Sequence, residues 1–173
     1  MNHLKQVHPS PWGWLFMRFK QVLLALGLGL TLTLFSQPGL AATCIVGSVT
    51  TPVFAPYQGV TLDATGSITV NCTSLATENV SYSIRLSLGN QALGTQRRMV
   101  QGGNFLTYNF FCSNGYSQVW ADGLGGSCVT TGGGSVQALF PLVSTHTVYG
   151  RIPGEQFVAA GAYNDSVILN VLY

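Results

Sequence analysis

The hydrophobic pattern at the C-terminal end of the sequence is that of a β-strand. The strand predicted from Asn164 onward carries apolar residues at a spacing of two, which places their side chains on one face: Val167, Leu169, Val171 and Tyr173. Ile168 and Leu172 make the other face apolar as well. No turn or partner strand follows in the sequence. A strand this apolar needs a neighbour on each edge, so the pattern predicts that another strand is supplied from elsewhere.

Similar short runs occur through the rest of the sequence, separated by turn residues. They predict strands at Ser67–Cys72, Tyr82–Leu88, Arg97–Val100, Phe105–Phe111, Gln118–Trp120, Ser135–Leu142 and Thr145–Ile152. Turns are predicted at Gly89-Asn90 and Asp122-Gly123, and a flexible turn at Gly132–Gly134. No stretch shows a sustained helical period. About seven short strands at regular spacing predict an all-β fold, an immunoglobulin-like β-sandwich.

Residues 1–42 have the layout of a secretory signal peptide. Lys5, Arg18 and Lys20 form a basic region before an uncharged run of fourteen residues, Val22–Phe35, which is shorter than the roughly twenty residues that span a bilayer. Candidate cleavage sites follow, after Ala41 or Ala42. We therefore expect an exported protein with one domain, residues 43–173, and no stable membrane span after cleavage.

Removal of the signal peptide changes the charge balance. Residues 43–173 contain four arginines, no lysine and five acidic residues, which gives a net charge of −1. This balance offers a nucleic-acid partner no electrostatic support. With so few charges, hydroxyl groups, amides and glycines must cover the surface. Such a composition suits a secreted β-protein that packs against copies of itself or against partners.

Four cysteines follow the predicted signal peptide: Cys44, Cys72, Cys112 and Cys128. An even number in an exported protein indicates two disulfides, for which four cysteines allow three pairings. We favour Cys44–Cys72 and Cys112–Cys128, because each joins sequence neighbours expected on adjacent strands.

The sequence offers no catalytic or metal-binding pattern. The acidic residues form no recognisable acid–base pair, and oxidised cysteines are not nucleophiles. There is no nucleophile elbow, phosphate-binding loop or Cys-x-x-Cys, and His146 is the one histidine after the signal peptide. We therefore expect no enzyme activity, no metal and no cofactor.

Several polar and aromatic residues permit either a structural or a binding interpretation. Trp120, Asp122 and Gly123 are compatible with a sugar-binding corner, but a buried tryptophan before a tight Asp-Gly turn is the favoured interpretation. Tyr149 and Gly150 are expected in a strand with a bulge rather than in a ligand site.

Two charged positions are also open. Arg97 and Arg98 are compatible with a partner contact, although exposed arginines on a strand are common. Asp165 is expected either to cap a turn or to pair with an arginine.

Motifs spread along residues 44–167 resemble those of a known family. The matching segments are Cys44, Gly66–Cys72, Tyr82 with Leu86–Gly89, Arg98-Met99, Leu106–Tyr108, Trp120–Gly123, Val148–Ile152 and Gly161–Val167, which includes Tyr163 and Asp165. In this order, behind a predicted signal peptide, they resemble the spore coat U domain, the fold module of archaic chaperone–usher pilus subunits.

The resemblance implies an incomplete sandwich that lacks its last strand. A periplasmic pilus chaperone would lend a strand to the open groove, and at the outer-membrane usher a strand from another pilus subunit would replace it. The residues expected to contact the chaperone or donor strand are Val167, Leu169, Val171 and Tyr173. The protein would be a structural subunit of a surface pilus that supports adhesion and biofilm formation. It would occupy the periplasm in transit and then the cell surface or the extracellular space.

The sequence departs from a pilus rod subunit in one respect. Cleavage after Ala41 or Ala42 leaves one or two residues before Cys44, whereas a donor strand needs about five to ten. We therefore expect a tip or terminal subunit that accepts a strand without donating one, although tip adhesins of this family tend to carry an extra domain. Two alternatives are a secreted coat protein that self-associates and a carbohydrate-binding module that uses Trp120.

Overall fold

The structure is a computed structural model that describes residues 41–173. The predicted signal peptide lies outside the described residues, apart from Ala41 and Ala42. The strands are β1 (Thr43–Thr50), β2 (Leu62–Thr73), β3 (Glu78–Leu86), β4 (Arg97–Gln101), β5 (Asn104–Phe111), β6 (Thr130–Val136), β7 (Leu142–Ile152) and β8 (Leu169–Leu172). Within the described part of the chain, no helix has the length and hydrophobicity needed to cross a membrane.

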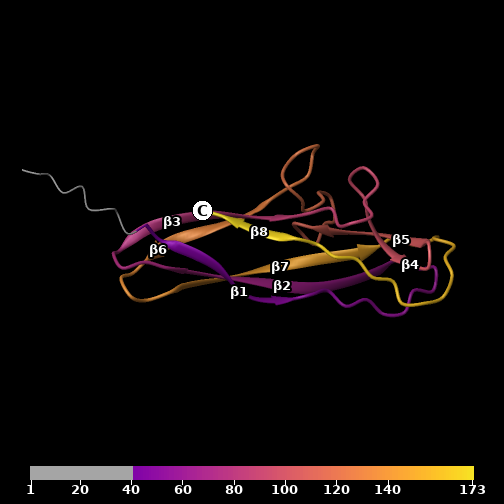
Figure 1. Ribbon diagram of the computed structural model, residues 1–173, viewed down its shortest axis with the longest axis horizontal. Coiled ribbons are helices and arrows are strands. Elements are labelled where there is room, and N and C mark those ends of the chain that lie inside the picture. Colours follow the sequence, from indigo (N-terminus) through magenta and orange to yellow (C-terminus); the bar gives the residue numbers. More distant parts are fainter. Residues whose placement is uncertain (1–40) are drawn as a thin grey trace, which may run out of the picture. The chain divides into compact units, whose positions relative to one another are not determined.

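The strands form two sheets that pack face to face. The larger sheet has the order β1-β2-β7-β5-β4, and the smaller sheet has the order β6-β3-β8. Figure 1 shows β3, β6 and β8 lying over β1, β2 and β7, with β4 and β5 towards the right-hand end. Each pair of neighbouring strands is antiparallel. The prediction of an all-β, immunoglobulin-like sandwich is therefore confirmed.

Alternation along β2 and β3 builds the core between the sheets. On both strands, buried apolar residues alternate with polar residues that are exposed or half-buried. The buried members of this main core are Cys44, Ile68, Val70, Cys72, Tyr82, Ile84, Leu86, Trp120, Val136 and Val148. Burial of a large aliphatic or aromatic side chain contributes about 1.5–3 kcal/mol, so this cluster is the main source of stability.

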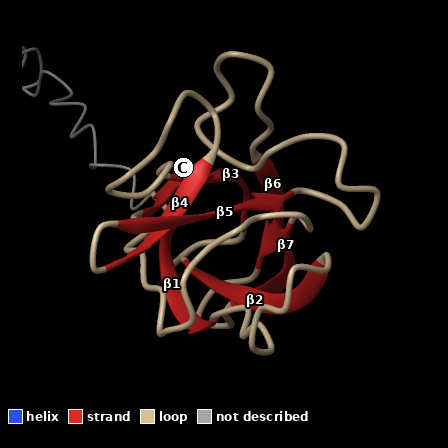
Figure 2. Ribbon diagram, turned by 90° about the vertical axis from the view of Figure 1, so that its right-hand side faces the viewer, coloured by secondary structure: helices blue, strands red, loops and turns tan. Residues whose placement is uncertain are grey.

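A smaller apolar cluster lies at the end of the sandwich formed by β4 and β5. Its buried members are Leu106, Tyr108 and Ile152, and partly buried side chains from the segment after β1 and the segment before β8 pack against them. Figure 2 shows this end facing the viewer, with β4 and β5 in front of the other strands.

The glycine run of β6 corrects the sequence prediction. Gly132–Gly134 form part of a strand that pairs with β3, not a flexible turn. A Cβ on Gly132 would lie 2.4 Å from the ring of its cross-strand partner Tyr82, so the ring covers the glycine and replaces the missing packing. The Tyr82 hydroxyl then meets His146 Nε2 of the larger sheet at 2.8 Å.

Two other predicted strands are wrong or shorter than expected. The run Ser135–Leu142 is broken by a tight turn, in which Phe140 N donates to Gln137 O at 3.0 Å between β6 and β7. The run Gln118–Trp120 forms isolated bridges and no strand. In both places the residues have β propensity, but the chain must turn sharply to continue the sandwich, so no continuous strand forms.

β1 is a strand that the sequence pattern did not predict. It contains a bulge between Val46 and Ser48, which leaves Gly47 as the extra residue. A Cβ on Gly47 would lie 2.6 Å from Asn71 Nδ2, so a larger residue there would require the Asn71 side chain to move. Because a bulge interrupts the period of two, the apolar residues of β1 do not alternate along the sequence.

The structure contains both disulfides with the pairing that we favoured. Cys44 on β1 is bonded to Cys72, its direct partner on β2. Cys112 is bonded to Cys128 and closes the long loop between β5 and β6. The first bond ties an edge strand to its neighbour, and the second fixes the loop that carries Trp120.

Loss of the Cys112–Cys128 disulfide should destabilise the domain measurably. A C112A/C128A variant should lose about 3 kcal/mol of unfolding free energy, because the unfolded chain gains the entropy of a loop of about 15 residues. Urea unfolding of the oxidised proteins measures the difference. Leu124→Ala, at an exposed site in the same loop, is the control and should remain within about 0.5 kcal/mol of the parent protein. Equal losses in both variants would contradict the prediction.

Candidate strand-accepting site

β8 is an edge strand with one face on the core. It pairs with β3, with Leu169 opposite Leu86 and Val171 opposite Ile84. Three of the four residues predicted on its inner face pack against the main core while remaining partly accessible: Val167, Leu169 and Val171. The fourth, Tyr173, is 62% exposed. Ile168 and Leu172 are exposed on the opposite face, as the alternation predicts.

β8 is shorter than the predicted strand. The prediction starts it at Asn164, whereas the structure starts it at Leu169. Asn164 instead exchanges two backbone hydrogen bonds with Val100 of β4, at 2.9 and 3.2 Å. These bonds tie the approach to β8 to the edge of the larger sheet.

The backbone of β8 alternates between a bonded side and a free side. Ser87 N donates to Ile168 O at 2.8 Å, which sets the phase of the ladder with β3. In an antiparallel ladder every second residue bonds to the same neighbour, so Asn170 and Leu172 bond to β3. Leu169 and Val171 therefore direct their N–H and C=O groups away from β3. No strand of the described chain forms hydrogen bonds with these outward-facing groups.

β1 has the complementary feature, core-facing side chains that remain exposed. Val46 lies opposite Val70 and Val49 lies opposite Ile68, so both valines are on the inner face of the larger sheet. Their partners on β2 are at most 1% exposed, yet Val46 is 40% and Val49 50% exposed. The inner face of β1 is therefore uncovered, although that of its neighbour β2 is packed. We call this face, together with the free edge of β8, the open side of the domain.

A separate cavity lies at the β4–β5 end of the sandwich. Its volume is about 590 Å³, and its walls come from the segment that follows β1 and the segment that precedes β8. Lining side chains include Phe54, Tyr57, Met99, Leu106, Ile152, Val158 and Tyr163. The Tyr163 hydroxyl donates to Ala159 O at 2.7 Å, so this residue of the predicted motif serves the local fold.

A polar contact fixes the segment before β8. Asp165 Oδ2 accepts a hydrogen bond from the Tyr108 hydroxyl at 2.8 Å, and Asp165 Oδ1 accepts one from Asn90 N at 3.1 Å. Burial, followed by the contact with Asp165, raises the pKa of Tyr108, which keeps it protonated and able to donate. Asp165 thus holds a turn, one of the two roles expected for it.

Arg97 is buried, which corrects the expectation that it is exposed. Its side chain is inaccessible to solvent, and it donates to Ser87 O from Nε at 3.0 Å and to Trp120 O from Nη2 at 2.7 Å. Burial lowers the pKa of its guanidinium to about 10, so the group stays charged at neutral pH. Because Arg97 occupies Ser87 O, Ile168 N bonds instead to Ser87 Oγ at 2.8 Å.

The Trp120 corner is structural. Trp120 is 0% exposed, and its Nε1 donates to Ile84 O at 2.8 Å. Asp122 Oδ1 accepts from Leu124 N at 2.9 Å in the turn that follows, where Gly123 has a φ of 87°. A sugar ring has no face of Trp120 to stack on, so the structure gives no support to a carbohydrate site built on this residue.

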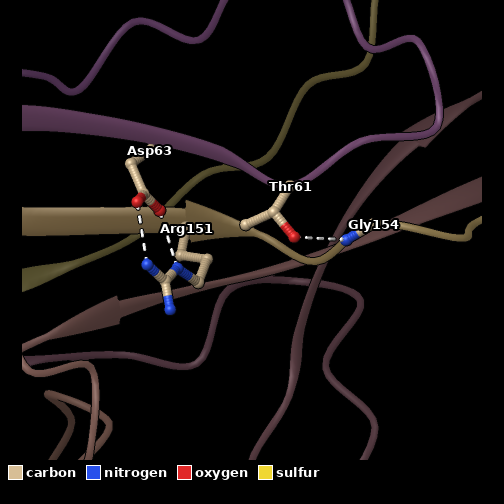
Figure 3. A network of polar contacts seen from close by, with 4 residues as sticks. All are labelled: Thr61, Asp63, Arg151 and Gly154. Carbon is tan, nitrogen blue, oxygen red and sulfur yellow. Dashed lines mark hydrogen bonds and ion pairs between the residues drawn. The ribbon is translucent and has the colours of Figure 1, made fainter.

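Tyr149 and Gly150 lie in a regular part of β7. The register with β2 is unbroken there, so the predicted bulge is absent. Gly150 is needed for a different reason, because a Cβ would lie 2.8 Å from Phe54 Cζ. The next residue, Arg151, binds Asp63 through two hydrogen bonds of 2.7 and 2.8 Å (Figure 3). This exposed pair lowers the pKa of Asp63 and joins β2 to β7 on their outer face.

The open side brings together the residues of β8 and two residues that the sequence pattern did not indicate, Val46 and Val49. Val46 and Val49 were missed because the bulge at Gly47 hides their common face. Such a strand can be recognised in a sequence when a period of two in apolar residues is interrupted by a single extra glycine.

Comparison with known proteins identifies the family. The family model of the Spore Coat Protein U domain matches residues 30–170. The chain therefore belongs to the spore coat protein U domain family, as its motifs indicated. No curated protein matches this chain significantly.

One similar solved structure is titled as the CsuC–CsuE chaperone–tip adhesion subunit pre-assembly complex from archaic chaperone–usher Csu pili of Acinetobacter baumannii. The matched chain is 17% identical, with a TM-score of 0.48. The match covers 77% of the present chain and 40% of the other, so the present chain spans less than half of that protein's length.

The two adjacent arginines of β4 should respond differently to the same substitution. Arg97→Lys should cost about 2–4 kcal/mol, because lysine cannot bridge two carbonyl groups and a buried charge loses partners. Arg98→Lys should cost less than about 1 kcal/mol, since Arg98 stacks on Phe105 at a partly accessible site. Urea unfolding measures both, and similar values for the two variants would contradict the buried role of Arg97.

Backbone amides along β8 should exchange with solvent in an alternating pattern. In the protein alone, the amides of Leu169 and Val171 should exchange faster than that of Asn170, which donates to β3. A strand that pairs with the free edge should slow Leu169 and Val171 and leave Asn170 unchanged. Hydrogen exchange followed by NMR measures each amide. Equal protection of all three in the protein alone would show that the β8 edge is already covered.

Proposed function

We propose that this protein is a structural subunit of a surface pilus of the archaic chaperone–usher type, assembled by donor-strand complementation. One observation carries the proposal. Core-facing valines of β1 are exposed, and the edge of β8 offers backbone groups that no described strand uses. An added strand that pairs with β8 would satisfy those groups and cover Val46 and Val49 with its own side chains.

The family membership supports the same assembly route. The proposed first partner is a periplasmic pilus chaperone, which lends a strand along Val167, Leu169, Val171 and Tyr173. At the outer-membrane usher, a strand from another pilus subunit then replaces the chaperone strand. Export through the predicted signal peptide precedes both steps, and the surface of the cell is the proposed destination.

The place in the fibre and its use form the finer part of the proposal. If cleavage follows Ala41 or Ala42, the mature domain accepts a strand without giving one, which suits a tip or terminal position. Adhesion and biofilm formation are the proposed outcomes. The competing function is a coat protein that associates without an usher, and it predicts an abundant, stable domain in the absence of a chaperone.

A matched set of β1 variants tests whether the open side accepts a strand. Val46→Asp and Val49→Asp should each reduce the yield of a one-to-one complex with a co-expressed archaic-type chaperone by about tenfold or more, because a strand there would bury an unpaired carboxylate. Ile45→Asp should leave the yield unchanged. Ile45 is 58% exposed and pairs with Asn71, so it faces the outer side of the sheet. The yield and mass of the purified complex are measured.

Two outcomes would overturn the proposal. One is a wild-type domain that is equally abundant and monomeric with and without the chaperone. The other is an equal loss of complex in the Ile45→Asp variant, which would indicate that the charge acts through folding and not through the open side. Thermal unfolding of the three variants separates these effects, because all three sites are exposed in the protein alone.

A further inference from the structure

A second strand edge is free for pairing, and its chemistry differs from that of β8. Among the described strands, β6 pairs only with β3, in a register that runs without interruption from Glu78↔Val136 to Ile84↔Thr130. Four of the residues of β6 are exposed: Thr131, Gly133, Gly134 and Ser135. The run Gly132–Gly134, for which the sequence pattern predicts a turn, is the centre of this edge.

The phase of the β3 ladder decides which β6 groups face outward. Arg85 of β3 bonds to Asn170 of β8, so its neighbour Ile84 bonds to β6. Continued along the ladder, this alternation directs the N–H and C=O groups of three residues away from the sheet: Thr131, Gly133 and Ser135. None of these groups has a hydrogen-bond partner in residues 41–173.

The β6 edge lacks the devices that shield natural edge strands. Such strands carry charges, prolines or bulges, or are covered by other chain segments. The sequence of β6 contains no charged residue and no proline, and its register shows no bulge. Gly133 and Gly134 have φ angles of 152° and 154°, and a Cβ on Gly133 would lie 2.3 Å from Val80 O. Gly133 and Gly134 therefore leave the centre of this edge without side chains.

We propose that β6 pairs with β6 of a second copy of this chain, antiparallel about a two-fold axis at Gly133. Gly133 then lies opposite Gly133 of the second copy, and Thr131 lies opposite Ser135 of the second copy. Three outward residues on each copy give about six hydrogen bonds between the copies. A second copy fits because the edge is complementary to itself: small neutral side chains meet small neutral side chains around a symmetric centre.

This pairing is independent of the proposed pilus assembly. It uses no residue of β1 or β8, so a domain that holds a donor strand keeps the β6 edge available. The two smaller sheets would join into one continuous six-stranded sheet, with β8 at each outer edge.

Charges placed at the two ends of the pairing test it. The double variant Thr131→Lys/Ser135→Lys sets like charges opposite each other at both ends and should raise the dimer dissociation constant about tenfold or more. Thr131→Lys/Ser135→Glu sets opposite charges against each other and should retain or strengthen the dimer. Both side chains are exposed, so thermal unfolding should be similar in the two variants. Analytical ultracentrifugation over a concentration series measures association of the protein alone and of its chaperone complex.

The outcomes separate this proposal from the pilus function. Wild-type protein that stays monomeric at every concentration, or equal dimerisation of the two double variants, overturns the β6 pairing. Association that is lost in Val46→Asp or on chaperone binding, and unaffected by the β6 charges, would place the contact at the β1–β8 side and also overturn it. Because the protein alone is measured too, failure to form a chaperone complex leaves this test intact.

Discussion

The apolar interior of this domain extends to the inner faces of β1 and β8, and no described strand lies between them. The rest of the described structure holds these two strands in place. The Cys44–Cys72 bond ties β1 to β2 at the one buried position of β1. On the other side, Asp165 and the bridge between Val100 and Asn164 anchor the segment that leads into β8.

Arg97 shows why part of this anchoring is polar. An apolar side chain in its place would leave the carbonyls of Ser87 and Trp120 without that donor in the interior, at a cost of about 1–3 kcal/mol for each group left unsatisfied. The guanidinium satisfies both, and Ile168 N, just before β8, bonds to the neighbouring Ser87 Oγ. A directional contact of this kind specifies the position of a strand more narrowly than packing alone.

Sequence reasoning succeeded where the pattern is local and failed where a residue depends on distant partners. The inner face of β8 and the strand β2 follow from uninterrupted alternation, and the disulfide pairing follows from sequence proximity. β1 was missed because one inserted glycine shifts its period. Gly132 was assigned to a turn because its packing comes from Tyr82, across the sheet. Arg97 was expected at the surface because its charge gives no sign of the two carbonyls that accept its hydrogen bonds.

The two free edges differ in what they demand of a partner. An occupant of the β8 edge must supply apolar side chains for the space above Val46 and Val49, so that contact combines backbone bonds with burial and is selective. The β6 edge presents glycine, serine and threonine, so pairing there gains backbone bonds and little apolar burial, which makes it weaker. A subunit with both edges would therefore complete its core through β8 at low concentration and pair through β6 only at higher protein concentration.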